Sequence, residues 1–238
     1  MTTDLWFDTQ LTPNTWIRQT LRGSGAGPYG GFNLGLHVGD HPSVVTQHRA
    51  FLAAQLGMPV HFVSQVHGVM VHEVAKTSME SIEADAMVTR EPLQALAILT
   101  ADCLPIVFAS ATAVGIAHGG WRGILAGVVT ETLQRLDGSS CHAWLGPCIG
   151  RETFEVGRDV RDAFLAQDAS LERFFQTTAR PMHWWCDLRG IVHTQLTAVG
   201  VDVLDVSAEC TLSQPERYYS YRRDGITGRM ATVVWRTE

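Results

Sequence analysis

Three polar side chains stand where apolar runs of the chain stop, and together they could hold a metal ion. His67 follows HFVSQV, Cys103 lies within LTADCLPIVF, and His118 follows AVGIA. Side chains from separate strand ends can converge on one rigid point. Two imidazoles and a thiolate suit zinc, and a fourth, open coordination position is typical of a catalytic site. Taken singly, such a histidine is more often an ordinary core or surface residue, and such a cysteine a small buried hydrophobe.

The segment after His118 carries a second feature. Gly119, Gly120 and Arg122 lead directly into a helical pattern. Glycines at a strand-to-helix junction let the backbone approach a ligand, and the N–H groups at a helix start attract an anion. We therefore predict that Arg122 binds substrate. The alternative is a plain tight turn with a solvated arginine.

The elements that must position these residues are a mixture of helices and strands. Apolar residues at helical spacing predict helices over Pro42–Gly57 and Ile124–Leu136. The C-terminal segment SYRRDGITGRMATVVW predicts a hairpin around Asp224-Gly225. Because helices and strands do not alternate strictly, we expect mixed sheets covered by helices. Short apolar runs bounded by glycine or proline predict strands at His61–Val66, Val69–Val74, Ala84–Thr89, Leu93–Leu99, Ile106–Ala109 and Ala113–Ala117.

Composition narrows the class of protein. Hydrophobic residues make up 45% and charged residues 18% of the 238-residue chain, and no linker divides it, so we expect one globular domain over residues 1–238. A net charge of −6 without a dense run of Lys or Arg argues against a nucleic-acid partner. No stretch approaches the ~20 apolar residues of a membrane span, and the N-terminus does not resemble a signal peptide. Five irregularly spaced cysteines fit a reducing compartment, so we expect a cytoplasmic protein.

Six motifs spread along the chain resemble one family. They are GGFNLGLHVGD (Gly30–Asp40), SQVHG (Ser64–Gly68), TADCLP (Thr100–Pro105), AHGGWRG (Ala117–Gly123), LGPCIG (Leu145–Gly150) and SYRRDGITGRM (Ser220–Met230). In this order they resemble the laccase-domain, or multicopper-polyphenol-oxidase-like, family, whose bacterial members have been called purine nucleoside phosphorylases and peptidoglycan editing factors. The chain departs from the commonest pattern at His48, where the resemblance leads us to expect Asn before Arg49.

The resemblance implies one zinc ion held by His67, Cys103 and His118. It implies an α+β fold, a four-layer α/β/β/α sandwich with mixed β-sheets. The implied activity is phosphorolysis of adenosine, inosine and S-methyl-5′-thioadenosine to free base and ribose 1-phosphate, together with deamination of adenosine. Purine nucleoside and phosphate are then the expected partners. In deamination, zinc would lower the pKa of water to about 7, so that it attacks the purine carbon bearing the amine.

Three residues outside the ligand set could serve these reactions. Asp102 and His37 are candidates for carrying the proton in deamination, although an aspartate beside a ligand often only orients it. Arg49 lies on the apolar face of its predicted helix, where it could hold phosphate in a bidentate contact. An internal ion pair is the alternative for Arg49.

Together with His37, two further side chains are predicted to bind substrate. Asn33 could hydrogen-bond a ribose hydroxyl, or it could fix its own turn. Arg222 and Arg223 would point to opposite faces of a strand, so that one arginine reaches the site, and we assign this role to Arg222.

Two other chemistries are compatible with the same residues. His₂Cys can bind copper, as in a phenol oxidase, but a multicopper site needs more histidines than these motifs offer, so zinc is preferred. Alternatively, Cys103 could be the nucleophile and His118 the base of a metal-free cysteine hydrolase acting on a peptidoglycan precursor.

Overall fold

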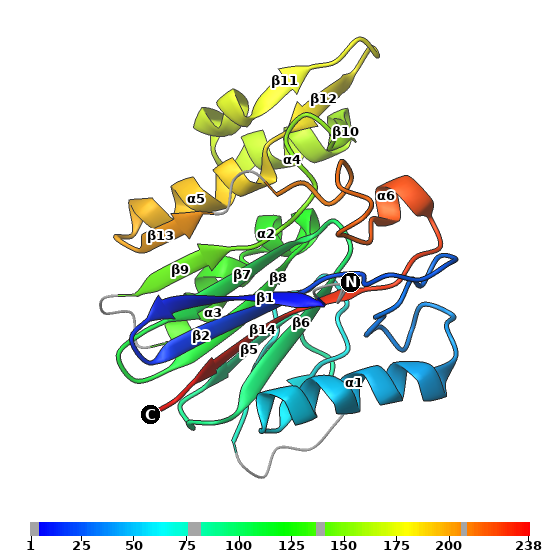
Figure 1. Ribbon diagram of the computed structural model, residues 1–238. Helices are drawn as coiled ribbons and strands as arrows, with labels where there is room; N and C mark the ends of the chain where they lie inside the picture. Colours follow the sequence, from blue (N-terminus) through cyan, green and yellow to red (C-terminus); the bar gives the residue numbers. More distant parts are fainter. Residues whose placement is uncertain (1–4, 76–81, 137–140, 206–208) are drawn as a thin grey trace.

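The fold is a mixture of helices and strands, seen in the computed structural model, which describes residues 5–75, 82–136, 141–205 and 209–238 (Figure 1). The strands are β1 (Trp6–Thr12), β2 (Thr15–Thr20), β3 (Val60–Phe62), β4 (Val71–Glu73), β5 (Ala86–Thr89), β6 (Ala95–Thr100), β7 (Leu104–Ala109), β8 (Val114–Gly119), β9 (His142–Leu145), β10 (Glu155–Gly157), β11 (Phe175–Thr177), β12 (His183–Cys186), β13 (Asp202–Asp205) and β14 (Met230–Arg236). The helices are α1 (Pro42–Leu56), α2 (Trp121–Ala126), α3 (Val128–Arg135), α4 (Arg158–Gln167), the 3₁₀ helix η1 (Ala169–Phe174), α5 (Leu188–Ala198) and α6 (Tyr221–Asp224).

Two mixed sheets form the centre of the molecule. The first has the order β1-β2-β14-β6-β3, with β3 parallel to β6 and the other pairs antiparallel. The second has the order β13-β9-β7-β8-β5-β4, with parallel pairs at both edges and antiparallel pairs between them. The predicted mixed sheets are therefore confirmed.

Three apolar cores separate four layers. Successive residues of a strand face opposite sides of its sheet. In β6, Leu96 and Ile98 pack between the two sheets, whereas Ala97 and Leu99 pack toward α1 with its Leu52. The outer face of the second sheet packs against residues of α2, α3, α4 and α5. This order of helix, sheet, sheet and helix is the predicted α/β/β/α sandwich.

A small third sheet, β10-β12-β11, lies with α4 at one end of the molecule (Figure 1). Nothing in the sequence patterns predicted this sheet, because each of its strands spans only three or four residues. The hairpin of β1 and β2 at the edge of the first sheet was also not predicted. No helix in the described ranges is long and apolar enough to cross a membrane.

The helix predicted over Ile124–Leu136 is wrong as a continuous element. Gly127 has φ of 103°, and its N–H donates to the carbonyls of Gly123 and Ile124, which ends α2 and begins α3. The left-handed conformation needs glycine and interrupts the helical hydrogen-bond ladder. By contrast, α1 follows its prediction, with Pro42 in its first turn and Gly57 as the left-handed cap.

The hairpin predicted around Asp224-Gly225 is also wrong. Residues Tyr221–Asp224 form the short helix α6, because the Ser220 side chain accepts a hydrogen bond from the N–H of Arg223. The following strand, β14, pairs with β2 and β6 in the first sheet. Arg222 and Arg223 therefore do not lie on opposite faces of a strand.

Candidate metal centre

The ligand atoms of His67, Cys103 and His118 all lie within 4.8 Å of one another. Nε2 of His67 is 3.8 Å from Sγ of Cys103, and the two imidazole rings lie edge to face with centroids 4.6 Å apart. Bonds of about 2.0–2.3 Å at tetrahedral angles place zinc ligands roughly 3.3–3.8 Å from each other. The cluster therefore has the dimensions of a metal site that needs only small adjustments on binding.

Strand pairing sets two of these residues side by side. His118, near the end of β8, lies opposite Pro105 of β7, and Cys103 stands two residues before that proline. His67 reaches the same place from the segment between β3 and β4. Both His67 and Asp102 have positive φ, 62° and 98°. Non-glycine residues hold such conformations only where their surroundings fix them, commonly at functional sites.

Asp85, at 0% exposure, orders two of the three ligands. Its Oδ1 accepts hydrogen bonds from the backbone N–H of His67 at 2.9 Å and from Nδ1 of His118 at 2.8 Å. Its Oδ2 accepts from the N–H of Val66 and Gly68 at 3.1 and 2.6 Å. Burial opposes ionisation, but the hydrogen bonds from His118 and Gly68 lower the pKa of the Asp85 carboxyl. With Nδ1 engaged, His118 is left to present Nε2 to an ion.

The cluster stabilises charge on its thiol. Burial acts to raise the pKa of Cys103, but the charge of His118 and hydrogen bonds from His118 and His67 lower it to about 6. Burial likewise opposes the charge of His118, but Cys103 and Asp85 raise the pKa of its imidazole to about 9. At neutral pH and without metal, the site is a thiolate–imidazolium pair.

A glycine makes room for the cluster. A Cβ atom on Gly120 would lie 2.6 Å from Cδ2 of His67 and 3.4 Å from Sγ of Cys103. The close approach at Gly120 is to side chains of the protein, and the predicted approach of the glycine pair to a bound ligand stays a prediction. Arg122 is exposed, and its guanidinium lies 4.4 Å from the ring centroid of Trp121.

The cluster opens to solvent on one side. His118 is 4% exposed, Cys103 is partly exposed and His67 is exposed. Two apolar side chains flank His67 on the same segment, Val66 at 50% and Met70 at 62% exposure.

Asn33 and His37 lie on one loop but differ in burial. Asn33 is fully buried, and its amide contacts Gly35, Asp40 and the N–H of Arg229. Its side chain thus fixes its own turn, which was the alternative to binding ribose. His37 is exposed. Partial shielding by neighbouring atoms, followed by the positive charges of Arg229, Arg49 and His118, lowers its pKa.

Asp102 and Arg49, both predicted to take part in the reaction, are engaged in internal contacts. The Asp102 carboxylate accepts from Thr211 Oγ1 at 2.7 Å and from the N–H of Arg222 at 2.7 Å. Nε of Arg49 donates to the carbonyl of Leu34, and its guanidinium lies 3.9 Å from the ring centroid of Phe62. Arg49 lines a pocket of about 660 Å³ beside α1, β3 and β4, whose lining does not include the three candidate ligands.

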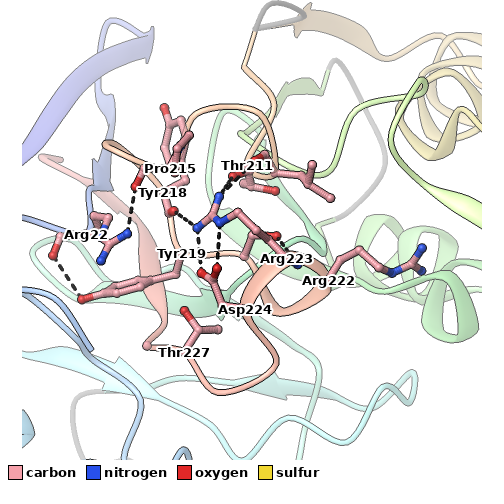
Figure 2. Close-up of polar contacts among 12 residues, drawn as sticks. Arg22, Thr211, Pro215, Tyr218, Tyr219, Arg222, Arg223, Asp224 and Thr227 are labelled. Atoms are coloured by element: carbon pink, nitrogen blue, oxygen red, sulfur yellow. Dashed lines mark hydrogen bonds and ion pairs between the residues drawn. The ribbon is translucent and has the colours of Figure 1, made fainter. Parts of the chain in front are cut away.

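The arginines of α6 have separate partners (Figure 2). Arg223 donates to the carbonyls of Thr211 and Tyr218 and pairs with Asp224. The side chain of Arg222 extends away from this group, as Figure 2 shows, and donates to the carbonyl of Glu155.

Sequence reasoning missed Asp85 and Arg229. Asp85 is an acidic residue inside the otherwise apolar run Ala84–Thr89, and a buried carboxylate in a strand needs partners, which was the available signal. Arg229 stands in the C-terminal motif, where a hairpin was expected. Burial lowers the pKa of its guanidinium, and the charges of Cys103 and Asp102 oppose this effect.

Fold and site together define a four-layer α+β protein with a metal-type His₂Cys cluster. The chain belongs to the multi-copper polyphenol oxidoreductase laccase family, whose model matches residues 15–237. A Pseudomonas aeruginosa purine nucleoside phosphorylase is 41% identical over 212 residues, 87% of each chain. The Escherichia coli purine nucleoside phosphorylase YfiH is 39% identical over 214 residues, again 87% of each chain.

Solved structures share the fold. A Neisseria meningitidis protein, 33% identical, superposes with a TM-score of 0.90 over 98% of this chain and 100% of its own. Bacillus licheniformis YfiH, 27% identical, gives a TM-score of 0.85 over 93% of this chain and 92% of its own. The family resemblance of the six motifs is therefore confirmed.

Proposed function

We propose that the protein is a zinc-dependent purine nucleoside enzyme. It would cleave adenosine, inosine and S-methyl-5′-thioadenosine with phosphate to the free base and the sugar 1-phosphate, and it would deaminate adenosine. One observation carries the proposal: the ligand atoms of His67, Cys103 and His118 lie within 4.8 Å of one another. The names of relatives at 41% and 39% identity support the substrate class.

The donor set fits zinc. Two imidazoles and a thiolate are borderline-soft ligands, and the Asp85 carboxylate on Nδ1 fixes the His118 ring as outer-shell carboxylates do in zinc sites. A zinc ion bound there would supply Lewis-acid chemistry to a substrate in the fourth coordination position. Because His67 is the exposed member of the set, substrate would approach from its side.

His37 is our candidate for moving the proton in deamination. Its lowered pKa keeps the imidazole neutral at pH 7, so the ring can accept a proton and pass it on to the departing amine. Asp102 has a different role, since both of its oxygens are engaged by Thr211 and Arg222. We propose that Asp102 is a positioning residue, which holds the turn that carries Cys103.

Phosphorolysis requires a held phosphate. A phosphate oxygen forms a bond to C1′ of the sugar, the bond from C1′ to the purine nitrogen breaks, and its electron pair leaves with the base, which takes up a proton. The chain must therefore place cationic donors beside the metal cluster. The exposed apolar side chains of Val66 and Met70, on the segment that carries His67, would pack against the flat face of a base.

A turnover assay tests this function. Adenosine is incubated with the zinc-loaded protein, with and without phosphate, and adenine, inosine and hypoxanthine are followed. We expect adenine only with phosphate and inosine in both cases. Cys103→Ala should abolish all three products, whereas Cys186→Ala, which removes a buried thiol of β12, should retain them. Absence of product above the Cys103→Ala background would refute the proposal.

Copper phenol oxidation is the second candidate, favoured by the copper in the family description. His₂Cys sets do bind copper. However, the described residues contain one group of three such ligands, whereas a multicopper centre needs several. Metal analysis of protein purified without added metal separates the two: copper at one or more equivalents per chain, with phenol turnover, would replace our proposal.

A cysteine hydrolase is the third candidate, favoured by the thiolate–imidazolium pair of Cys103 and His118. Peptidoglycan-precursor hydrolysis that survives EDTA would support it. Nucleoside turnover that is lost with EDTA and restored by zinc would support the leading proposal.

A further inference from the structure

Arg229 lies at the junction of the first sheet with the metal cluster. Met230 pairs with Thr100 and Ala231 with Leu99 in the antiparallel register of β14 and β6. Arg229 therefore stands one residue beyond the last pair, where the chain after β6 turns into Asp102 and Cys103. Its place is set by the sheet register and not by a mobile loop.

The neighbouring loop holds the backbone of Arg229 on both sides. Its N–H donates to Oδ1 of Asn33 at 2.8 Å, and its carbonyl accepts from the N–H of Leu34 at 3.1 Å. Its aliphatic stem packs on Gly35, where a Cβ atom would lie 2.8 Å from Cγ of the arginine. The buried Asn33 and the glycine thus fix the direction in which the side chain leaves the backbone.

The guanidinium of Arg229 uses only some of its hydrogen-bond donors. Nη1 donates to the carbonyls of Thr227 and Gly228 at 3.0 and 2.9 Å, and the group lies 5.8 Å from the ring centroid of Tyr221. Among the residues that the structure describes, Arg229 forms no ion pair, and no hydrogen bond is made by Nε or Nη2. A partly buried guanidinium with two unused donors has the form of an oxyanion receptor.

The charges around Arg229 also favour the binding of an anion. Burial lowers the pKa of Arg229, and the charges of Cys103 and Asp102 act against this effect. Once a metal ion binds Cys103, the ion shares the negative charge of the thiolate. Less negative charge then remains to balance the guanidinium of Arg229. Burial lowers the pKa of the neighbouring His37, and the positive charges of Arg229 and Arg49 add to this effect. A phosphate ion would pair with the guanidinium of Arg229 and balance its positive charge.

We propose that Nε and Nη2 of Arg229 bind the phosphate co-substrate beside the metal cluster. The inference rests on the proposed phosphorolysis, and it replaces Arg49 as the principal phosphate ligand. Nε of Arg49 is already bonded to Leu34, and its guanidinium lies against Phe62. Nε and Nη2 of Arg229 instead donate to no residue that the structure describes, and the charge of Cys103 acts on this guanidinium.

The test compares Arg229→Gln with Arg158→Gln, a matched change at an arginine of α4 that is 66% exposed and paired with Asp162. Binding of inorganic phosphate to the zinc-loaded protein is measured by calorimetry, and KM values for phosphate and nucleoside are measured separately. Loss of charged hydrogen bonds should weaken phosphate binding roughly 10–100-fold in Arg229→Gln. Nucleoside KM and adenosine deamination, which consumes no phosphate, should change less than about twofold. Arg158→Gln should behave as wild type, and Arg229→Lys, which keeps the charge without the fork, should be intermediate.

A measurement on the unaltered protein covers the case in which Arg229→Gln does not fold. Phosphate should protect Arg229, but not Arg158, from modification by phenylglyoxal, as read by peptide mass analysis. Equal modification with and without phosphate, or an unchanged phosphate affinity in folded Arg229→Gln, would overturn the proposal. If no nucleoside is cleaved but phosphate binding depends on Arg229, the proposed function fails while the anion subsite stands.

Discussion

Cys103 and Cys186 show how two thiols of one chain acquire opposite properties. Cys186, at the end of β12, is fully buried, and burial together with the charge of Asp187 raises the pKa of its thiol. Cys103 also experiences desolvation, yet His118 and His67 lower the pKa of its thiol to about 6. Neighbouring imidazoles, and not burial, therefore turn a thiol into a ready metal ligand.

Removing each thiol should give the largest contrast. Cys103→Ala deletes one of three proposed ligands, so we expect zinc content to fall from one equivalent to near zero, beyond the roughly 10–100-fold affinity loss of an outer-shell change. Cys186→Ala should keep its zinc and lose about 1 kcal/mol of unfolding free energy. Elemental analysis and denaturant unfolding measure both. Equal zinc content in the two variants would remove the distinction between the thiols.

Asp85→Asn sharpens the comparison by disturbing the imidazoles without removing a ligand. The carboxylate accepts hydrogen bonds from His118 and from the segment that carries His67, so we expect zinc affinity to fall roughly 10–100-fold. Competition with a chelator of known affinity measures the change. The control Asp162→Asn, at a 51% exposed carboxylate of α4, should leave the affinity unchanged. A wild-type affinity in Asp85→Asn would show that ordering by Asp85 is dispensable.

Gly120→Ala tests how closely His67 must approach Cys103. The added Cβ would lie 2.6 Å from the His67 ring and must displace it. Overpacking of this kind costs about 1–3 kcal/mol, so we expect zinc affinity to fall about tenfold. Gly57→Ala is the control, since its Cβ would meet nothing within 4 Å and only its φ of 68° is strained. That variant should lose stability but keep its zinc affinity.

Alkylation rates compare the reactivity of the Cys103 and Cys186 thiols directly, and this is the smallest of the expected differences. In metal-free protein, the Cys103 thiolate should react with iodoacetamide at pH 7 at close to its maximal rate. Because its pKa is lowered, the rate should fall as the pH drops through about 6. Cys186 should stay unreactive until the protein unfolds, and zinc should protect Cys103. A rate midpoint near pH 8.5 would contradict the effect assigned to His118 and His67.

Locally encoded parts of the molecule could be predicted from the sequence. Pro42 and Gly57 bound α1 as expected, and apolar runs correspond to β5, β6, β7 and β8. The grouping of His67, Cys103 and His118 was anticipated because each stands at the end of an apolar run, and the structure places them within 4.8 Å. Their role as metal ligands stays a prediction.

The missed features depend on contacts between distant segments. Asp224-Gly225 carries a strong local hairpin signal, but Ser220 caps a helix there and Asp102, from another strand end, binds the N–H of Arg222. Asp85 can accept a hydrogen bond from His118 only because β5 pairs with β8 and brings the two residues together. The spacing of residues along the sequence does not reveal these contacts between distant segments. The helix at Tyr221–Asp224 and the role of Asp85 could therefore not be assigned from the local pattern alone.

The identity and the ligands of the bound ion decide the proposed chemistry of the site. X-ray absorption at the zinc and copper edges, on protein purified without added metal, measures both. We expect one zinc per chain with one sulfur at about 2.3 Å and two imidazole nitrogens at about 2.0 Å, and no sulfur in any residual zinc of Cys103→Ala. Copper in place of zinc, or a zinc shell without sulfur in the wild-type protein, would contradict the proposed zinc site of His67, Cys103 and His118.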